Sequence, residues 1–232
     1  MTNPRHGAAA VLAALGLAVA AVPAPGQISL DARAEVARLE HRVRFDGLVE
    51  PSSGTVFGGA LGVVIGERFE VWGEAVGGHL AAVSANGEPS DFAHVQLLGG
   101  MHVHPWLTLQ GGLSVFTYTT PVARQQWTAL RLGAEADVPL ALEGLRGIVR
   151  GQWMPVVSVS GLPHPEVGLA AGTGIEWRGR RIGVAALYSL ERYDFPASGG
   201  AQRLEELSSL QLRATIRLRP GGRGPSGATT SP

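Results

Sequence analysis

Strict alternation of apolar and polar residues is the feature of this sequence that most limits its fold. In LQLRATIRLRP (residues 210–220), Leu, Ala and Ile occupy every second position, and Gln, Thr and Arg stand between them. Successive side chains of a β-strand point to opposite faces, so this period of two predicts a strand with one apolar and one cationic face. The apolar face then lies against either a protein core or lipid.

The same alternation recurs from residue 28 onward in segments separated by turn residues. Ten segments are expected, over residues 28–45, 55–66, 69–82, 91–103, 107–118, 128–140, 145–156, 167–178, 182–193 and 207–219. Most of them exceed the roughly 5–6 residues of soluble strands and match the about 9–11 residues that a tilted membrane-spanning strand needs. Their length therefore favours lipid over a protein core.

The connections between these segments alternate in length. Long polar connections are expected at 46–54, 83–90, 119–127, 160–166 and 194–206, and tight turns at 66–69, 104–106, 142–145 and 178–181. Up-and-down connection puts every long loop at one end of a barrel and every tight turn at the other.

Aromatic residues point the same way, because most lie at or near segment ends. These are Phe45, Phe57, Phe69, Phe92, Trp106, Phe116, Tyr118, Trp127, Trp177, Tyr193 and Phe195, whereas Trp72, Trp153 and Tyr188 lie well inside segments. A soluble core concentrates its large rings in the middle of strands, but a membrane barrel places them in two interfacial girdles. The apolar face of residues 210–218 is therefore expected to face lipid.

With these segments, turns and rings, the chain resembles a small bacterial outer-membrane β-barrel protein of a Gram-negative envelope. The resemblance implies an all-β fold, an antiparallel up-and-down transmembrane β-barrel with long external loops and short periplasmic turns. Ten strands are preferred, and eight is the fallback count. It also implies location in the cell outer membrane, contact with membrane lipids and lipopolysaccharide, handling by the outer-membrane assembly machinery, and an external surface partner reached through the loops.

The chain ends are expected to lie outside the barrel. Arg5 and His6 precede an apolar run at residues 8–22, and Ala24 and Gly26 are small residues suited to a cleavage site. This arrangement predicts a secretory signal peptide over 1–26. The barrel is then expected over 27–219, with a flexible tail over 220–232.

The polar strand faces are expected to line a narrow lumen, where charges need partners. Barrel closure would place 207–219 beside 28–45, so that Arg213 pairs with Glu35 or Glu40. Because the signs are mixed, an ion-paired plug is predicted. The expected lumen-facing charges are Arg33, Glu35, Glu40, Arg131, Glu135, Asp137, Arg146, Arg150, Glu176, Glu191, Arg213 and Arg217.

Two segments depart from a regular strand pattern. Residues 28–45 also fit a helix, since Ala32, Val36 and Leu39 recur at helical spacing. Interpreted as a strand, which we favour, the segment changes face parity near Ala37 and requires a β-bulge. Pro155 lacks an N–H group, so the ladder of its strand is expected to end or bulge there.

Composition and motifs argue against several functions. The formal net charge is zero, which gives no bulk attraction to nucleic acid, and the absence of cysteine excludes thiol catalysis, disulfides and cysteine-bound zinc. His94, His102 and His104 share a strand face but have no evident third ligand, so neither a metal nor a cofactor is expected.

Catalysis is not predicted either. The titratable residues expected at the external rim are scattered, with no spacing that suggests a nucleophile–base pair; they are Asp46, Asp91, His164, Glu166 and Asp194. The expected role is non-enzymatic, as an envelope-structural or surface-interaction protein. A narrow porin-like solute channel and a soluble exported β-barrel that binds an apolar ligand stay open as alternatives.

Overall fold

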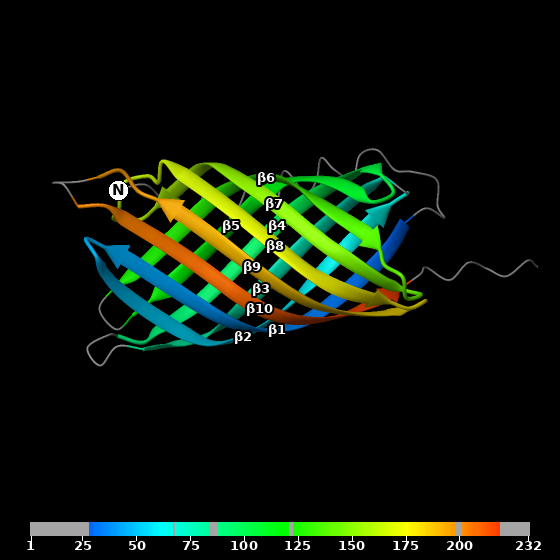
Figure 1. The fold of residues 1–232 in the computed structure, drawn as a ribbon, viewed down its shortest axis with the longest axis horizontal. Coiled ribbons are helices and arrows are strands. Elements are labelled where there is room, and N and C mark those ends of the chain that lie inside the picture. Colours follow the sequence, from blue (N-terminus) through cyan, green and yellow to red (C-terminus); the bar gives the residue numbers. More distant parts are fainter. Residues whose placement is uncertain (1–27, 67, 84–87, 121–122, 198–200, 219–232) are drawn as a thin grey trace, which may run out of the picture.

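The computed structural model describes residues 28–66, 68–83, 88–120, 123–197 and 201–218. They form a closed barrel in which each strand pairs antiparallel with the next and the last pairs with the first (Figure 1). The strands are β1 (Ile28–Phe45), β2 (Leu48–Ile65), β3 (Phe69–Ala82), β4 (Ser90–His104), β5 (Leu107–Thr119), β6 (Arg124–Pro139), β7 (Leu145–Val159), β8 (Val167–Arg178), β9 (Ile182–Asp194) and β10 (Arg203–Leu218). The predicted ten-stranded up-and-down barrel is confirmed.

Other predictions concern the chain ends and helices. The predicted signal peptide, 1–26, and tail, 220–232, lie outside the described residues. Among those described, no helix is long and apolar enough to cross a membrane.

Strand β1 forms despite its helical spacing because both of its edges are paired. It pairs with β10 from Leu30 opposite Leu218 to Phe45 opposite Arg203, and with β2 along its whole length. Neither register shifts, so the bulge expected near Ala37 is wrong.

The change of face parity expected in β1 near Ala37 does not occur, and side chains keep alternating in direction. What changes there is the environment that the outward side chains meet. Glu35, Leu39 and His41 are all buried in the lumen, so odd-numbered residues face inward on both sides of Ala37. Outward positions change from apolar to charged near the same height. Glu40 is one of them, which corrects its predicted lumen position: it lies on the outer wall and accepts a hydrogen bond from Arg42 Nε at 2.7 Å.

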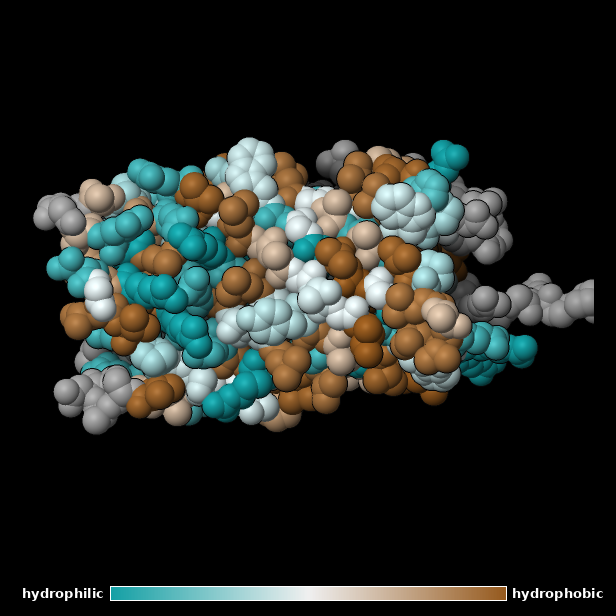
Figure 2. All heavy atoms as spheres, in the orientation of Figure 1, coloured by the Kyte–Doolittle hydropathy of each residue, from teal (hydrophilic) through white to brown (hydrophobic). Residues whose placement is uncertain are grey.

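The same change occurs around the barrel. The outward side chains of β10 are apolar from Leu218 to Leu210 and then become Ser208 and Glu206, and Figure 2 shows hydrophobic residues covering the half that carries the tight turns. A run of about nine residues, tilted by about 40°, spans roughly 23 Å, close to the apolar band of membrane barrels. The barrel wall therefore extends beyond the lipid at its other end.

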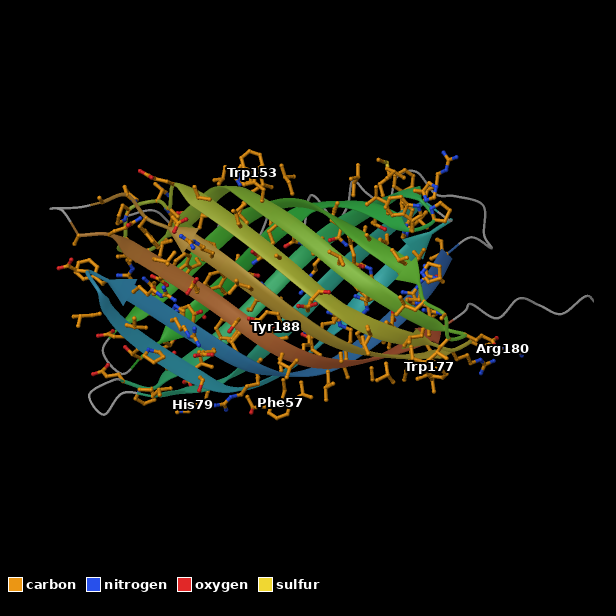
Figure 3. All side chains as sticks on the ribbon, in the orientation of Figure 1. Phe57, His79, Trp153, Trp177, Arg180 and Tyr188 are labelled. Carbon is orange, nitrogen blue, oxygen red and sulfur yellow. The ribbon has the colours of Figure 1, made fainter. Side chains whose placement is uncertain are left out.

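The outward-facing aromatic girdles lie at the two edges of this apolar band. They do not coincide with the ends of the strands. Trp177 faces outward near the tight turns, while Phe57, Trp153 and Tyr188 face outward about midway along the barrel (Figure 3). Six rings expected at an interface are instead buried inside. They are Phe92, Phe116, Tyr118, Trp127, Tyr193 and Phe195, and the prediction failed for them because the strands continue above the membrane.

The first long loop, 46–54, was also wrongly predicted. Asp46 and Gly47 alone form the turn, with φ values of 47° and 80°, as a type I′ hairpin requires, and 48–54 belong to β2. Pro51 is tolerated in this strand because the side to which its backbone polar groups point has no ladder bond to lose. Its carbonyl faces the β3 side, where it accepts a hydrogen bond from Val83 N at 3.0 Å. Its missing N–H therefore also points to that side, beyond the last β2–β3 pair, Ser52 with Ala82.

The effect predicted for Pro155 is confirmed. The β6–β7 register shifts between Leu130 and Leu132, opposite Pro155, and the β7–β8 ladder ends at Trp153 opposite Leu169. Since proline cannot donate to a ladder, the two strands separate where it occurs.

Candidate functional site

The barrel interior is the candidate site, because it gathers every predicted lumen charge except Glu40. Its contents change with height. Apolar rings fill the end with the long loops, hydrogen-bonded charges occupy the middle, and a ring of ion pairs lies near the tight turns.

The rings of the first level form what we call the outer plug. Trp127 stacks on Phe116 with ring centroids 5.1 Å apart and meets Tyr193 at 4.9 Å, and all three are at most 2% exposed. Among the described residues, this dense packing of rings fills the barrel interior at this height. The outer plug comprises Ala37, Leu39, Val56, Leu80, Phe92, Phe116, Tyr118, Trp127, Ala129, Met154, Val157, Val159, Tyr193, Phe195 and Leu207.

A buried carboxylate lies among these apolar side chains. Glu205 is fully buried, and its two oxygens lie 2.9 Å from His41 Nε2 and 2.8 Å from Arg203 Nε. The ring of His41 stacks on Tyr118 with a centroid distance of 4.3 Å. Both carboxylate oxygens therefore have partners, as a buried charge requires.

In the middle of the lumen, Arg131 and Glu191 form a bidentate ion pair. The guanidinium Nη1 and Nη2 each lie 2.8 Å from one carboxylate oxygen. Arg131 also donates to Ser114 Oγ and Gln152 Oε1, and Tyr193 donates its hydroxyl to Glu191 at 2.7 Å. Because β6 and β9 are not neighbours, this pair crosses the lumen and closes it further.

Arg213 lies near one of its two expected partners. Its Nε is 3.6 Å from Glu35 Oε2, which also accepts a hydrogen bond from Gln211 at 2.6 Å. Glu40, the other expected partner, faces the opposite way on the outer wall.

Near the tight turns, Asp137 connects two arginines. Arg146 donates to it, and Arg178 Nη2 lies 2.9 Å from Asp137 Oδ2 while also contacting Glu176. These four side chains are 11–33% exposed, so solvent reaches them. Further contacts of this ring are Arg217 with Asp31, Trp72 with Glu70 and Thr108 with His102.

Two cavities lie between these levels. The larger, about 100 Å³, has Leu39, Val56 and Phe92 of the outer plug on one side and Glu35 and Arg131 among its polar lining on the other. The smaller, about 40 Å³, lies nearer the tight turns. Both are suited to a few waters or a small ion.

The three histidines considered as ligands do not converge. His94 lies beside the Phe116 ring, His102 is bonded to Thr108, and His104 packs beside Trp106. In the described part of the chain, no group of three possible ligands is close enough to hold a metal.

The titratable rim residues are also dispersed. Asp91 Oδ1 lies 3.0 Å from His79 Nδ1 on the outer wall, His164 donates to the Val157 carbonyl, and Asp194 accepts hydrogen bonds from Arg192.

Several interior residues were missed by the sequence analysis. Arg178 shares its face with Glu176, so alternation alone could have found it. Arg203 and Glu205 were assigned to a loop, and His41 was hidden by the expected bulge. Asp31 and Tyr193 were missed as well.

Comparison with known proteins finds similarity in structure and none in sequence. No family model and no curated protein matches the sequence. The outer membrane protease OmpT from Escherichia coli is similar in structure, with a TM-score of 0.56 and 7% identity over 86% of this chain and 100% of that one. The translocator domain of autotransporter NalP from Neisseria meningitidis has a TM-score of 0.45 and 14% identity over 92% and 96%. The β domain of the Bordetella autotransporter BrkA has 0.48 and 14% over 83% and 100%.

The closed barrel, its apolar belt and its two aromatic girdles together define an integral outer-membrane β-barrel protein. Lipid and lipopolysaccharide therefore surround the half of the barrel that carries the tight turns. The end with tight turns is the periplasmic end, as in other barrels of this class.

Proposed function

We propose that this protein is a closed, non-catalytic barrel with an envelope-structural or surface-interaction role. The observation that carries the proposal is the outer plug. Trp127, Phe116 and Tyr193 fill the barrel where a solute from outside would have to enter.

Opening the plug would be costly. Removing one buried aromatic side chain from a packed core costs about 3–5 kcal/mol, and the rings of the outer plug contact one another. The Arg131–Glu191 pair below them is a second barrier, since separating it would leave a desolvated carboxylate. Both features favour a barrel that stays shut.

The raised wall supports a surface role. Above the lipid, β1 presents Arg38, Glu40, Arg42 and Arg44 outward, and Glu206 of β10 faces the same way. This charged wall is clear of the membrane and available to a partner outside the cell. The titratable residues at the rim support a role without catalysis. His164 and Asp194 form hydrogen bonds with nearby residues, and the Asp91–His79 pair is exposed on the outer wall.

Planar-bilayer recording tests the closed state. We expect the purified full-length protein to give no steady current. The matched control is a Phe116→Ala, Trp127→Ala variant, which should show flickering current because it loses the centre of the outer plug. A stable, ion-selective current from the unaltered protein would instead favour the narrow solute channel.

A further inference from the structure

The larger cavity, of about 100 Å³, lies on the periplasmic side of the outer plug and has charges of both signs in its lining. Glutamates and arginines border it in equal number. They are Glu35, Glu74, Glu191, Arg131, Arg150 and Arg213. Because these charges cancel, the lining as a whole favours neither a lone anion nor a lone cation as an occupant.

Two of these charged groups have no ionic partner. The bidentate pair that crosses the lumen accounts for two of the others, and Arg213 lies 3.6 Å from Glu35. Among the described residues, no carboxylate oxygen lies within 4.0 Å of Arg150, and no arginine or histidine nitrogen lies within 4.0 Å of Glu74. Glu135 is opposite Arg150 in the β6–β7 ladder, but its carboxylate is beyond that distance.

Arg150 and Glu74 lie on nearly opposite walls of the lumen. Glu74 is carried by β3 and Arg150 by β7, and three strands separate β3 from β7 on one side of the barrel and five on the other. Both side chains nevertheless border the same cavity. An occupant that pairs with both of them needs a positive end and a negative end.

The acidic side of the cavity also lacks hydrogen-bond donors. Glu74 accepts one hydrogen bond, from Gln96 at 2.9 Å, and Glu35 Oε1 is buried without any hydrogen-bond partner. His94 Nε2, which belongs to the same lining, is buried without a partner as well. Buried polar groups in folded proteins almost always have partners, and an ammonium group offers three donors at one point. A positive end between Glu35 and Glu74 would therefore complete this wall.

Size limits the occupant further. An apolar cavity of about 150 Å³ holds benzene, so a cavity of about 100 Å³ suits a molecule of about four or five non-hydrogen atoms. We propose that the larger cavity binds one small zwitterion of the size of glycine, with its ammonium group toward Glu35 and Glu74 and its carboxylate toward Arg150. The site goes beyond the structural role proposed above, and its failure would leave that role untouched.

The ligand enters from the periplasmic end. Arg178 and Arg217 at that end are 33% and 30% exposed, so solvent reaches the ring of ion pairs, whereas the outer plug fills the interior at the opposite end. The two cavities share Arg150 and Arg213 in their linings. Movement of these flexible side chains would join the cavities and give a periplasmic solute a route that an external solute lacks.

Thermal unfolding in the presence of glycine tests the proposal. The full chain, folded in detergent at neutral pH and constant ionic strength, is titrated with glycine while its unfolding midpoint is followed. A ligand that binds only the folded state raises the midpoint in a saturable manner. We expect such a rise with glycine and none with sodium acetate or methylammonium chloride, each of which carries only one of the two charges.

Glycine betaine controls for the general effect of a zwitterionic solute, because its trimethylated nitrogen has no N–H group to donate. We expect betaine to give no saturable rise. An equal response to methylammonium and glycine, or the same non-saturating response to betaine and glycine, would overturn the proposal.

Three variants locate the site. Arg150→Gln and Glu74→Gln should each weaken the apparent glycine affinity by about tenfold or more, because each removes a charge-assisted contact. Arg44→Gln, on the exposed outer wall, should leave the affinity unchanged. Unchanged glycine affinity in either Arg150→Gln or Glu74→Gln would contradict the assigned pose.

Diffraction from crystals of the unaltered protein keeps the test decisive if these variants fail to fold. Crystals soaked in glycine should show a molecule that extends from Glu74 toward Arg150, and crystals without glycine should not. Identical water density in both crystals would reject the site.

Discussion

At the scale of single residues, the surroundings of an ion pair decide its importance. Arg131 and Glu191 are 4% and 19% exposed, and each of the three guanidinium nitrogens of Arg131 donates to a defined oxygen. Arg44 and Glu206 form a similar contact at 3.2 Å on the outer wall, but Arg44 is 48% exposed. Water can replace the second contact and has little access to the first, so the two pairs should respond differently to mutation.

Arg131→Met tests this difference. The change keeps much of the side-chain volume but leaves Glu191 without its cation. Breaking a buried pair in this way costs about 3–5 kcal/mol. We expect a loss of that size in the free energy of unfolding, measured by urea titration of the protein folded in lipid vesicles.

Arg44→Met is the matched control, for which a change of about 0–1 kcal/mol is expected. The double variant Arg131→Met, Glu191→Leu should recover part of the lost stability, because it removes the stranded carboxylate as well. Equal losses in Arg131→Met and Arg44→Met would contradict the assigned burial of the central pair.

At the scale of elements, a strand passes through two environments in succession. The outward face of β10 contacts lipid from Leu218 to Leu210 and meets solvent at Ser208 and Glu206. Its inward face changes from polar to apolar over the same distance, from Arg213 and Arg217 near the tight turns to Leu207 in the outer plug. One regular strand therefore inverts its polarity without any break in its ladder.

Two arginine substitutions on the same face of β10 test where the inversion occurs. Ala214→Arg places a charge at mid-depth in the lipid and should destabilise the folded barrel by roughly 2–4 kcal/mol. Ser208→Arg, six residues along the same face, should have little effect because it lies above the lipid. Unfolding titrations in vesicles measure both, and similar losses would show that the belt reaches higher than inferred.

The inversion explains what alternation could and could not predict. A period of two located the strands and the lipid face of residues 210–218, because both depend on local side-chain direction. The period carries no information on whether a face meets lipid, water or the barrel interior. For this reason the sequence placed Glu40 in the lumen, and it placed the rings of the outer plug in an interfacial girdle. The turn at Asp46–Gly47 was readable, since Asp-Gly is a strong hairpin signal, but the polar residues after it were given more weight.

The ion pairs of the interior depend on more than one strand. Arg131 and Glu191 are 60 residues apart and lie on strands that are not neighbours. Their meeting is determined by strand number, stagger and closure of the whole barrel. Sequence alone supplied the members of this pair but had no means of matching them.

At the scale of the whole molecule, the barrel is about half embedded and half raised. The embedded part has an apolar exterior (Figure 2) and a polar interior, and the raised part has a more polar exterior with the outer plug as its apolar core, like a soluble domain built on the same strands. The raised part can therefore be stabilised by its own core without lipid. This arrangement presents a rigid wall, as well as loops, to the outside.

Cysteine labelling along β6 tests this arrangement in whole cells, and the absence of native cysteine makes every signal specific. Gln126 faces outward on the raised wall, Ala134 faces outward within the apolar belt, and Leu142 lies in the exposed turn at the other end. An impermeant maleimide should label Gln126→Cys in intact cells and should not label Ala134→Cys. Leu142→Cys should react only after the outer membrane is permeabilised.

The comparison of Gln126→Cys with Ala134→Cys is the decisive one, because the two positions share a strand and a face and differ only in height. Pro163→Cys, in the exposed connection between β7 and β8, is the positive control for surface access. If Gln126→Cys were protected to the same degree as Ala134→Cys, the wall of β6 would be embedded up to its outer end. The polarity inversion would then be a lipid-facing polar surface that needs a protein neighbour within the membrane, and the raised-wall account of the outer surface would be abandoned.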